Sequence, residues 1–263
     1  MLKKFPMETL RVPVDGRTAR CRVVHPSPRP DRPLLGLPLL LLHGLGCSSE
    51  AWEPSLRRLA ETGVDAPVAA PDLPGYGHSP GPGEALGIED LADWAARLLD
   101  ALGIERAHAA GSSMGCQVAL ALARRHPGRV GGVVLVAPTT GRRVVPAWRY
   151  LIGLPLDGLA ETLRYNVTLL RMYRQMGVPR YLATIPKMLQ DDPIGEAARV
   201  AAPCLLLRGT RDRLVPDVAA HRLAAALPRA KFVHVPDAAH AIQFNNPGEF
   251  VRRARHFLAG ASN

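Results

Sequence analysis

The pentapeptide Gly111-Ser112-Ser113-Met114-Gly115 has residue types and spacing that could support nucleophilic catalysis. It lies between a short apolar segment, 104–110, for which we expect a strand, and an alanine-rich segment from Cys116 to near His126, for which we expect a helix. A G-x-S-x-G sequence between a strand and a helix is typical of a sharp turn that exposes its central serine. Its glycines tolerate strained backbone and close packing. The pattern predicts that Ser113 is a nucleophile.

A serine hydroxyl is a weak nucleophile at neutral pH, so it needs a base and a group that orients the base. Asp212 is favoured as the orienting acid because it follows an apolar run, 203–207, and open α/β sheets place their chemistry at the carboxyl ends of strands. Asp217 and Asp237 are alternatives: the first could cap the next helix, and the second lies three residues before the expected base. The segment 137–156, after the preceding predicted strand, contains no carboxylate.

His240 is favoured as the general base because it follows a strand-like segment, 231–235, and an imidazole accepts and returns a proton near neutral pH. The last helix is expected to begin just beyond it, at Asn246-Pro247. The other histidines fall in loops, on helix surfaces, in predicted strands or in glycine-containing motifs, where packing or solvation explains them. Position alone therefore selects His240.

Backbone amides would stabilise the oxyanion that forms when a serine attacks a carbonyl. Leu39–Leu42 is typical of a buried strand, and it leads into His43-Gly44-Leu45-Gly46. We expect the amides of Leu45 and Met114 to form the oxyanion hole. His43 and Gly44 are also placed in the predicted substrate pocket, with His43 bracing the loop rather than transferring protons.

Together these motifs resemble the α/β-hydrolase family in its single-domain, serine-dependent form. The resemblance extends over about residues 38–258 and rests on five matches: 43–46, 72–79, 111–115, Asp212 and His240. It implies an α/β fold with a mostly parallel central sheet flanked by helices, the chain order serine, acid, histidine, and an inserted helical cap. Haloalkane dehalogenases and epoxide hydrolases are similar elsewhere in the chain, but their nucleophile is an aspartate and Ser113 argues against their chemistry.

The elements that would position these groups fit one domain, 1–263, since α/β folds often reach this length undivided. An apolar stripe predicts a helix over 88–102. Two strand-like segments, 9–14 and 18–24, flank a turn signal and predict a hairpin. A proline-rich segment, 26–38, predicts an irregular connection.

About 65 residues without obvious strands separate the predicted strand at 133–136 from the one at Leu205. The resemblance implies that 141–195 forms a helical cap inserted between the sixth and seventh strands. Most of its apolar residues are expected to pack the cap onto the body, but we place Trp148, Tyr173 and Met176 in the substrate pocket. This set favours a hydrophobic acyl or alcohol group in the substrate.

The net charge of +10 raises the question of an anionic partner. The positive residues are mostly arginines spread along the whole chain, and the densest cluster, 252–256, fits a solvated helix face, so we expect no nucleic-acid binding. An acidic carrier protein stays open as a partner. The four cysteines lack metal-like spacing, and no stretch resembles a signal peptide or a membrane span, so we expect no metal, no cofactor, no stable membrane insertion and a cytoplasmic location.

The expected function is a serine hydrolase that cleaves an ester or thioester of a small to medium hydrophobic substrate through an acyl-enzyme intermediate. Related enzymes with the same triad catalyse C–C bond hydrolysis, acyl transfer or cyclisation, and these reactions form the alternative. A non-catalytic ligand-binding protein is a third reading, because function does not follow from fold. The sequence predicts neither the physiological substrate nor the oligomeric state.

Overall fold

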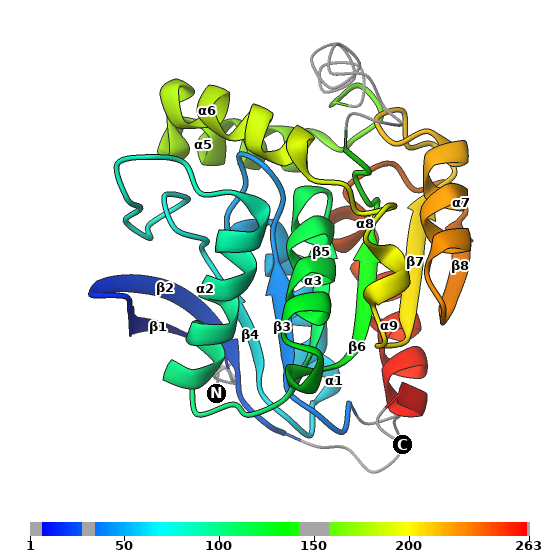
Figure 1. Ribbon diagram of the computed structural model, residues 1–263, viewed down its shortest axis with the longest axis horizontal. Helices are drawn as coiled ribbons and strands as arrows, with labels where there is room; N and C mark the ends of the chain where they lie inside the picture. The colour runs from blue at the N-terminus through cyan, green and yellow to red at the C-terminus, as the bar shows by residue number, and fades with distance from the viewer. Residues whose placement is uncertain (1–6, 28–34, 142–157, 262–263) are drawn as a thin grey trace.

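The computed structural model describes residues 7–27, 35–141 and 158–261. Eight strands form one sheet, in the spatial order β1-β2-β4-β3-β5-β6-β7-β8 (Figure 1). Their bounds are Met7–Val14, Arg17–Val24, Leu39–Leu42, Val68–Pro71, Ala107–Ser112, Val130–Val136, Cys204–Gly209 and Ala230–Val235 for β1 to β8. Strand β2 runs antiparallel to both of its neighbours, β1 and β4, and the other pairs in this sheet are parallel. The predicted fold class is therefore confirmed.

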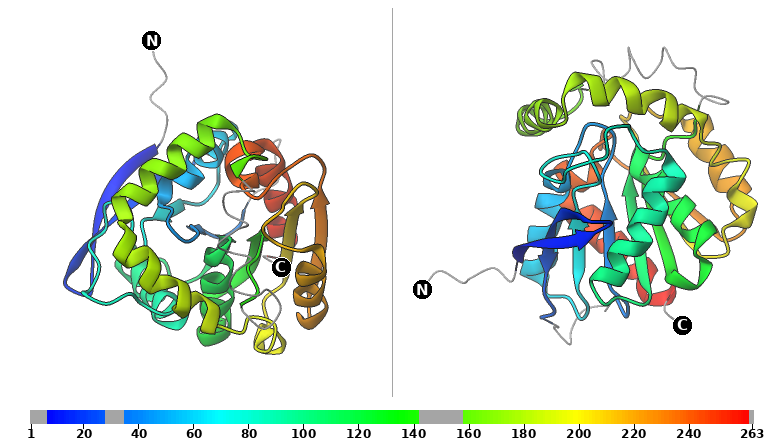
Figure 2. Two further views of the ribbon diagram at one scale, coloured as in Figure 1. Left: turned by 90° about the horizontal axis from the view of Figure 1, so that it is seen from above. Right: turned by 60° about the vertical axis from the view of Figure 1, so that its left-hand side comes forward.

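Helices cover both faces of the sheet (Figures 1 and 2). Helices α2 (Ile88–Ala101) and α3 (Met114–Arg125) pack together on one face, and α1 (Glu53–Thr62) and α9 (Pro247–Ala261) pack together on the other. Helix α7 (Asp217–Ala226) flanks β8, and the short α8 (Ile242–Asn245) precedes α9. Three short 3₁₀ turns are η1 (Ser49–Trp52), η2 (Pro127–Arg129) and η3 (Ala197–Arg199).

The core consists of two apolar layers, one on each side of the sheet. In β3, Leu40 and Leu42 belong to the layer under α2 and α3, whereas Leu39 and Leu41 belong to the layer under α1 and α9. Successive side chains of a strand point to opposite faces, so a central parallel strand is buried on both sides and reads as a continuous apolar run. This explains the four consecutive leucines.

The hairpin predicted near the N-terminus is confirmed as β1 and β2, which pair along their full length. Asp15 and Gly16 form its turn with φ values of 51° and 70°. Two positive φ values match the twist of the flanking strands, and Asp-Gly is a preferred pair for such a turn.

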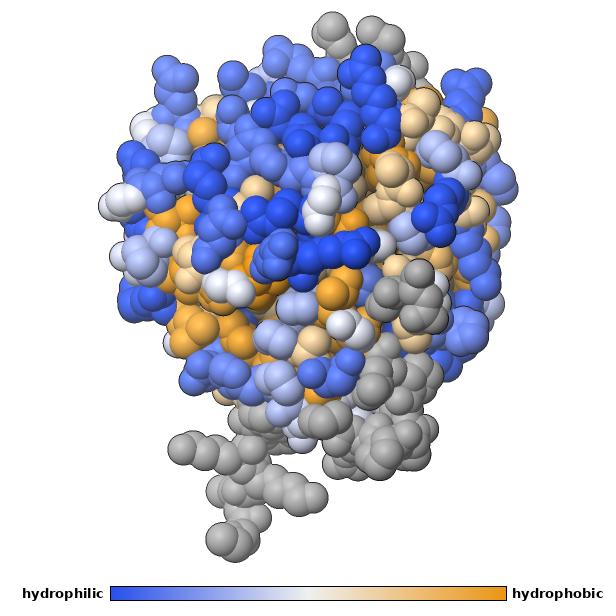
Figure 3. Space-filling view, turned by 60° about the horizontal axis from the view of Figure 1, so that its bottom comes forward, coloured by the Kyte–Doolittle hydropathy of each residue, from blue (hydrophilic) through white to orange (hydrophobic). Residues whose placement is uncertain are grey.

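Between β6 and β7, the described residues include helices α5 (Leu163–Met176) and α6 (Val178–Gln190), which lie over the carboxyl ends of the parallel strands (Figures 1 and 2). The predicted cap, 141–195, includes the segment 142–157, which lies outside the described residues. Its bounds therefore stay a prediction. At the opposite end of the sheet, hydrophilic side chains are spread across the surface with apolar patches between them (Figure 3).

Candidate active site

Ser113 occupies the turn between β5 and α3 with φ 55° and ψ −120°. A positive φ is uncommon for a residue with a side chain, and such strain persists only where the surrounding structure imposes it. Here the serine amide donates a hydrogen bond to the carbonyl of Val136 on β6, at 2.9 Å. The neighbouring strand therefore holds the turn in this conformation.

The glycines near Ser113 are required by space. A Cβ atom on Gly111 would lie 2.1 Å from the carbonyl oxygen of Gly115, and one on Gly115 would lie 2.2 Å from that of Leu42. A Cβ atom on Gly44 would lie 3.1 Å from Cβ of Ser113. The strand β5, the start of α3 and the end of β3 thus approach one another as only glycine allows.

Asp212 and His240 form a buried pair. The Nδ1 atom of His240 lies 3.0 Å from Oδ2 of Asp212, whose side chain is fully buried. The other carboxylate oxygen accepts hydrogen bonds from the amides of Leu214 and Val215, each at 2.9 Å. A carboxylate only accepts, so Nδ1 of the neutral imidazole carries the proton and Nε2 is its basic nitrogen.

The alternative acids engage other groups. Asp217 lies at the start of α7, where its carboxylate is 2.6 Å from Nε2 of His234 and 3.1 Å from Nδ1 of His221. Asp237 has a positive φ of 57°, and its amide donates to the hydroxyl of Thr210. Of the three carboxylates weighed in the sequence, the structure brings Asp212 to His240.

The amides of Leu45 and Met114 are available for an oxyanion. Within the described chain, neither amide donates a hydrogen bond to another protein group. Met114 is the first residue of α3, where helix geometry leaves N–H groups unsatisfied and the helix dipole favours negative charge. This arrangement fits the predicted oxyanion hole.

His43 is fully buried and holds the loop that precedes α1. Its Nδ1 lies 2.9 Å from the carbonyl of Gly44, and its Nε2 accepts from the amide of Leu73 at 3.0 Å. Burial lowers the pKa of this imidazole, which matches a neutral ring that donates through one nitrogen and accepts through the other. The geometry fits the bracing role, and His43 does not line the cavity described next.

A cavity with about 460 Å³ of empty space, partly open to solvent, lies at Ser113 and His240. It is lined by Gly44, Leu45, Cys47, Ser112, Ser113, Gly158, Glu161, Tyr165, Asn166, Leu169, Tyr173 and His240. Larger hollows beside α2 and between α1 and α9 contain no nucleophile paired with a base among their described residues. The cavity at Ser113 is therefore the site of interest.

Of the predicted pocket residues, His43 does not line the cavity, and the other four divide into three groups. Gly44 and Tyr173 line the cavity, whereas Met176 is buried in the core layer under α2 and α3. Trp148 lies outside the described residues. Helical spacing marks which residues of α5 are apolar, but it does not distinguish the cavity wall from the core.

Cys47 is a second nucleophile-bearing side chain in the cavity wall. Burial raises the pKa of its thiol to about 12. The thiolate is the reactive form of cysteine, and at neutral pH almost none would be present. Burial also raises the pKa of Cys116, directly after the pentapeptide. Serine is therefore the better nucleophile at this site.

Glu161 was not singled out in the sequence, yet it connects the start of α5 to the loop of His240. Its carboxylate accepts a hydrogen bond from the amide of Ala241 at 2.7 Å and another from the side chain of Asn245. The hydroxyl of Thr162 also donates to Asn245, at 2.6 Å. Glu161 lies about 80 residues before these partners, so no local pattern could have revealed the contact.

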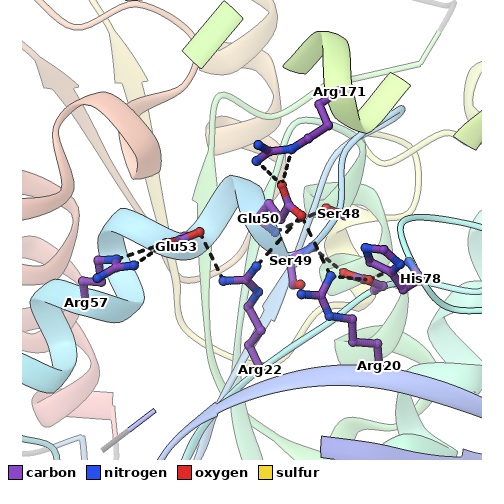
Figure 4. A network of polar contacts seen from close by, with 10 residues as sticks. Arg20, Arg22, Ser48, Ser49, Glu50, Glu53, Arg57, His78 and Arg171 are labelled. Carbon is purple, nitrogen blue, oxygen red and sulfur yellow. Dashed lines mark hydrogen bonds and ion pairs between the residues drawn. The ribbon is translucent and has the colours of Figure 1, made fainter. Parts of the chain in front are cut away.

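A second polar contact attaches α5 to the body. The guanidinium of Arg171 donates to the buried carboxylate of Glu50 in η1, which also lies 3.9 Å from Arg20 and from Arg22 on β2 (Figure 4). In Figure 4, Arg171 points down from α5 toward Glu50, and the two β2 arginines approach from below. Glu50 therefore joins helix α5 to strand β2 through its three cationic neighbours.

No metal site or membrane span is found in the described part of the chain. No group of three or more histidine, cysteine, aspartate or glutamate side chains there could hold a metal ion. No helix there is both long and apolar enough to cross a membrane.

The sequence model of the alpha/beta hydrolase family matches residues 39–254. The chain is 30% identical over 250 residues to a 2-hydroxymuconate semialdehyde hydrolase of Pseudomonas sp. (strain CF600), covering 86% of this chain and 88% of that one. It is 27% identical to a pimeloyl-[acyl-carrier protein] methyl ester esterase of Aliivibrio salmonicida, covering 85% and 92%. A solved esterase of Thermogutta terrifontis superposes with a TM-score of 0.74 at 21% identity, covering 97% of this chain and 100% of the esterase.

Proposed function

Because the chain belongs to the alpha/beta hydrolase family, we propose that it is a serine hydrolase that cleaves an ester or thioester of a small to medium hydrophobic substrate. One observation carries the proposal: the strained Ser113 and the His240–Asp212 pair meet at one cavity. Nucleophile, base and orienting acid in one place are the parts that acyl transfer requires.

In the proposed mechanism, Oγ of Ser113 attacks the carbonyl carbon while Nε2 of His240 accepts the hydroxyl proton. Asp212 holds the imidazole in the correct tautomer and stabilises the imidazolium. The amides of Leu45 and Met114 stabilise the tetrahedral oxyanion. The imidazolium then protonates the leaving group, and a water molecule activated by His240 releases the acyl group from the serine.

The lining of the cavity supports an uncharged, hydrophobic substrate. Its described side chains include Leu45 and, from α5, Leu169 and Tyr173. They also include one carboxylate, Glu161, but no lysine or arginine. A neutral ester or thioester fits this surface better than a dianion.

We propose further that α5 and α6 belong to a cap that covers the site, within the predicted bounds 141–195. Helix α5 contributes Tyr165, Leu169 and Tyr173 to the wall of the cavity that Ser113 and His240 also line. Such a cap excludes water from the reaction and shapes the pocket for the acyl or alcohol group.

The test is hydrolysis of p-nitrophenyl esters of increasing acyl length by the wild type and by Ser113→Ala. We expect Ser113→Ala to lower kcat by at least about 10⁴-fold, because the residues of a triad act as a unit. Ser112→Ala is the matched control in the same turn and should cost less than about tenfold. A fluorophosphonate should also label the wild type at Ser113, as read by mass spectrometry. More than a tenth of the wild-type rate in Ser113→Ala would contradict the proposal.

C–C bond hydrolysis is the second reaction, and the 30% identity to the 2-hydroxymuconate semialdehyde hydrolase favours it. The same variants should be assayed with 2-hydroxymuconate semialdehyde. A kcat/KM for this compound more than about 100-fold above that for the best ester would assign the C–C reaction. The apolar and aromatic side chains in the cavity wall, such as Leu45, Leu169 and Tyr173, lead us to expect the opposite order.

A substrate presented by an acidic carrier protein is the third possibility to test. The Aliivibrio relative is named for an ester on an acyl-carrier protein, and this chain has a net charge of +10. A kcat/KM for a carrier-bound ester at least tenfold above that for the same free acyl ester, lost at high salt, would support it.

A further inference from the structure

The outward surface of α5 carries an apolar stripe that packs against nothing in the described chain. Leu163, Val167 and Leu170 are 79%, 60% and 62% exposed. Their spacing of four and three residues places them on one side of the helix. Tyr165, Met172 and Met176 face the other way and are buried. Packing explains the inner face, but it does not explain the outer one.

Further exposed apolar residues lie before and after α5 in the chain. Leu159, before the helix, and Val178 and Leu182, on α6, are 77%, 70% and 56% exposed. Among the described residues, all but one of the strongly exposed large apolar side chains fall between 159 and 182, and the exception is Val218 on α7. Single exposed leucines are ordinary, but a contiguous set marks a surface that binds something.

The same two helices are positively charged. Their sequences, 163–176 and 178–190, contain Arg164, Arg171, Arg174, Arg180 and Lys187 and no aspartate or glutamate. Arg174 lies eleven residues after Leu163, which places it at the end of the apolar stripe. Neither Arg174 nor Lys187 makes an ion pair with another described residue. The surface therefore offers apolar side chains together with unneutralised cationic ones.

We propose that this surface, made of the outward faces of α5 and α6, binds peripherally to an anionic lipid membrane. Helices with exposed leucine and valine beside arginine and lysine bind at the boundary between headgroups and acyl chains, where both kinds of side chain are stabilised. Binding at this depth needs no helix that spans the bilayer, and none is found in the described chain.

Two other occupants fit less well. A second copy related by a two-fold axis would place the arginines of one α5 against those of the other, and like charges at an interface are unfavourable. An acidic protein would need pockets or matching hollows for its anchor residues. None of the exposed apolar residues of α5 and α6 lines a cavity, whereas a fluid lipid surface accepts protruding side chains without one.

The lipid surface and the cavity share one helix. Leu169 and Tyr173 line the cavity, while Leu163, Val167 and Leu170 on the same helix face outward. Bound to a membrane, α5 would separate the catalytic cavity from the lipid by the thickness of one helix. Membrane binding itself does not depend on the proposed function. If the protein is a serine hydrolase as proposed, its position on the membrane implies that the substrate is an ester dissolved in the lipid, and this second conclusion rests on the proposed function.

The experiment is co-sedimentation with sucrose-loaded vesicles of phosphatidylcholine alone or with 30% phosphatidylglycerol. The triple variant Leu163→Gln, Val167→Gln, Leu170→Gln removes apolar area without adding charge. We expect it to bind anionic vesicles about 100-fold more weakly, roughly fivefold for each side chain. Val218→Gln is the matched control on α7 and should bind like the wild type. Arg174→Gln should bind anionic vesicles about fivefold more weakly and neutral ones as before.

Turnover of a short, water-soluble ester serves as a check on folding, and the triple variant should retain it. Failure of that turnover in the wild type itself would count against the proposed function and leave the binding result to stand alone. Wild type that fails to sediment with anionic vesicles at millimolar lipid, or that binds neutral vesicles equally well, would overturn the lipid proposal. So would a wild-type dimer that the triple variant converts to a monomer in light scattering, or capture of an acidic carrier protein without vesicle binding.

Discussion

Ser113 and helix α5 both line the candidate active-site cavity, but different kinds of contact hold them there. The turn of Ser113 is fixed by backbone: the carbonyl of Leu42 leaves no room for a side chain on Gly115, and the amide of Ser113 bonds to β6. Helix α5 and the residues just before it are held largely by side chains: Arg171 of α5 bonds to Glu50, and Glu161 bonds to the loop of His240.

This difference separates the turn that we propose performs the chemistry from the helix that we propose selects the substrate. Backbone contacts in a close-packed interior cannot relax when one atom is added. A helix attached through a few side chains can accept substitutions at most other positions. We therefore expect changes at the turn to cost the fold, and changes on α5 to alter specificity or binding at little cost in stability.

The largest effect is expected for Gly115→Ala. Its Cβ atom would lie 2.2 Å from the carbonyl oxygen of Leu42 and 2.8 Å from that of His43, and backbone on both sides has nowhere to move. We expect a loss of about 3 kcal/mol in the free energy of unfolding, measured by urea denaturation. Gly128→Ala, where no atom lies within 4 Å, is the control and should change it by less than about 0.5 kcal/mol. Equal stability of the two variants would show that close backbone packing does not fix the turn of Ser113.

Much of the body could be predicted because apolar runs and turn residues are local signals. Strand β3 has four buried leucines, and the turn between β1 and β2 has an Asp-Gly pair. Strand β4 was not predicted, because Val68-Ala69-Ala70-Pro71 has little intrinsic β-propensity. It forms since β2 and β3 pair on either side of it, and such tertiary contacts are not encoded in four residues.

The pocket was harder to predict than the positions of the proposed triad. Ser113, Asp212 and His240 each follow a strand, and parallel strands bring their carboxyl ends to one edge. Tyr173 and Met176 share helical spacing, yet one lines the cavity and the other enters the core. That distinction depends on how α5 is seated on the body, which periodicity does not contain.

The contact between the end of α6 and helix α3 offers a pH-dependent test of how the helices over the cavity are attached to the body. Asp191, at the end of α6, accepts a hydrogen bond from Gln117 of α3 at 2.9 Å. Burial raises the pKa of its carboxyl to about 6, above the value of about 4 in an unfolded chain. The native state therefore binds the proton more tightly, and this residue's contribution to stability falls as pH rises from about 4 to 6 and stays constant above.

Asp191→Asn removes the charge but keeps an oxygen for Gln117. We expect the variant to be about 2 kcal/mol more stable than the wild type at pH 8, because the charged carboxyl is partly desolvated there. At pH 4 the two proteins should have nearly equal free energies of unfolding. Urea denaturation at the two pH values measures the difference. The same difference at both would show that the carboxyl charge is not its source.

The smallest effect sharpens the comparison, because it concerns Glu161, which lies just before α5 and contacts the loop of the proposed base His240. Glu161→Gln keeps an acceptor for the amide of Ala241 but removes the negative charge near His240. Charge-assisted hydrogen bonds are stronger than neutral ones, so we expect kcat to fall about tenfold, with KM and the melting temperature nearly unchanged. Glu84→Gln changes an exposed glutamate whose backbone carbonyl accepts a hydrogen bond from Arg180, and it should have no effect. A change in KM alone would indicate that Glu161 contacts the substrate. A change in kcat alone would indicate that Glu161 positions His240, although it lies beside the helix that we expect to govern specificity.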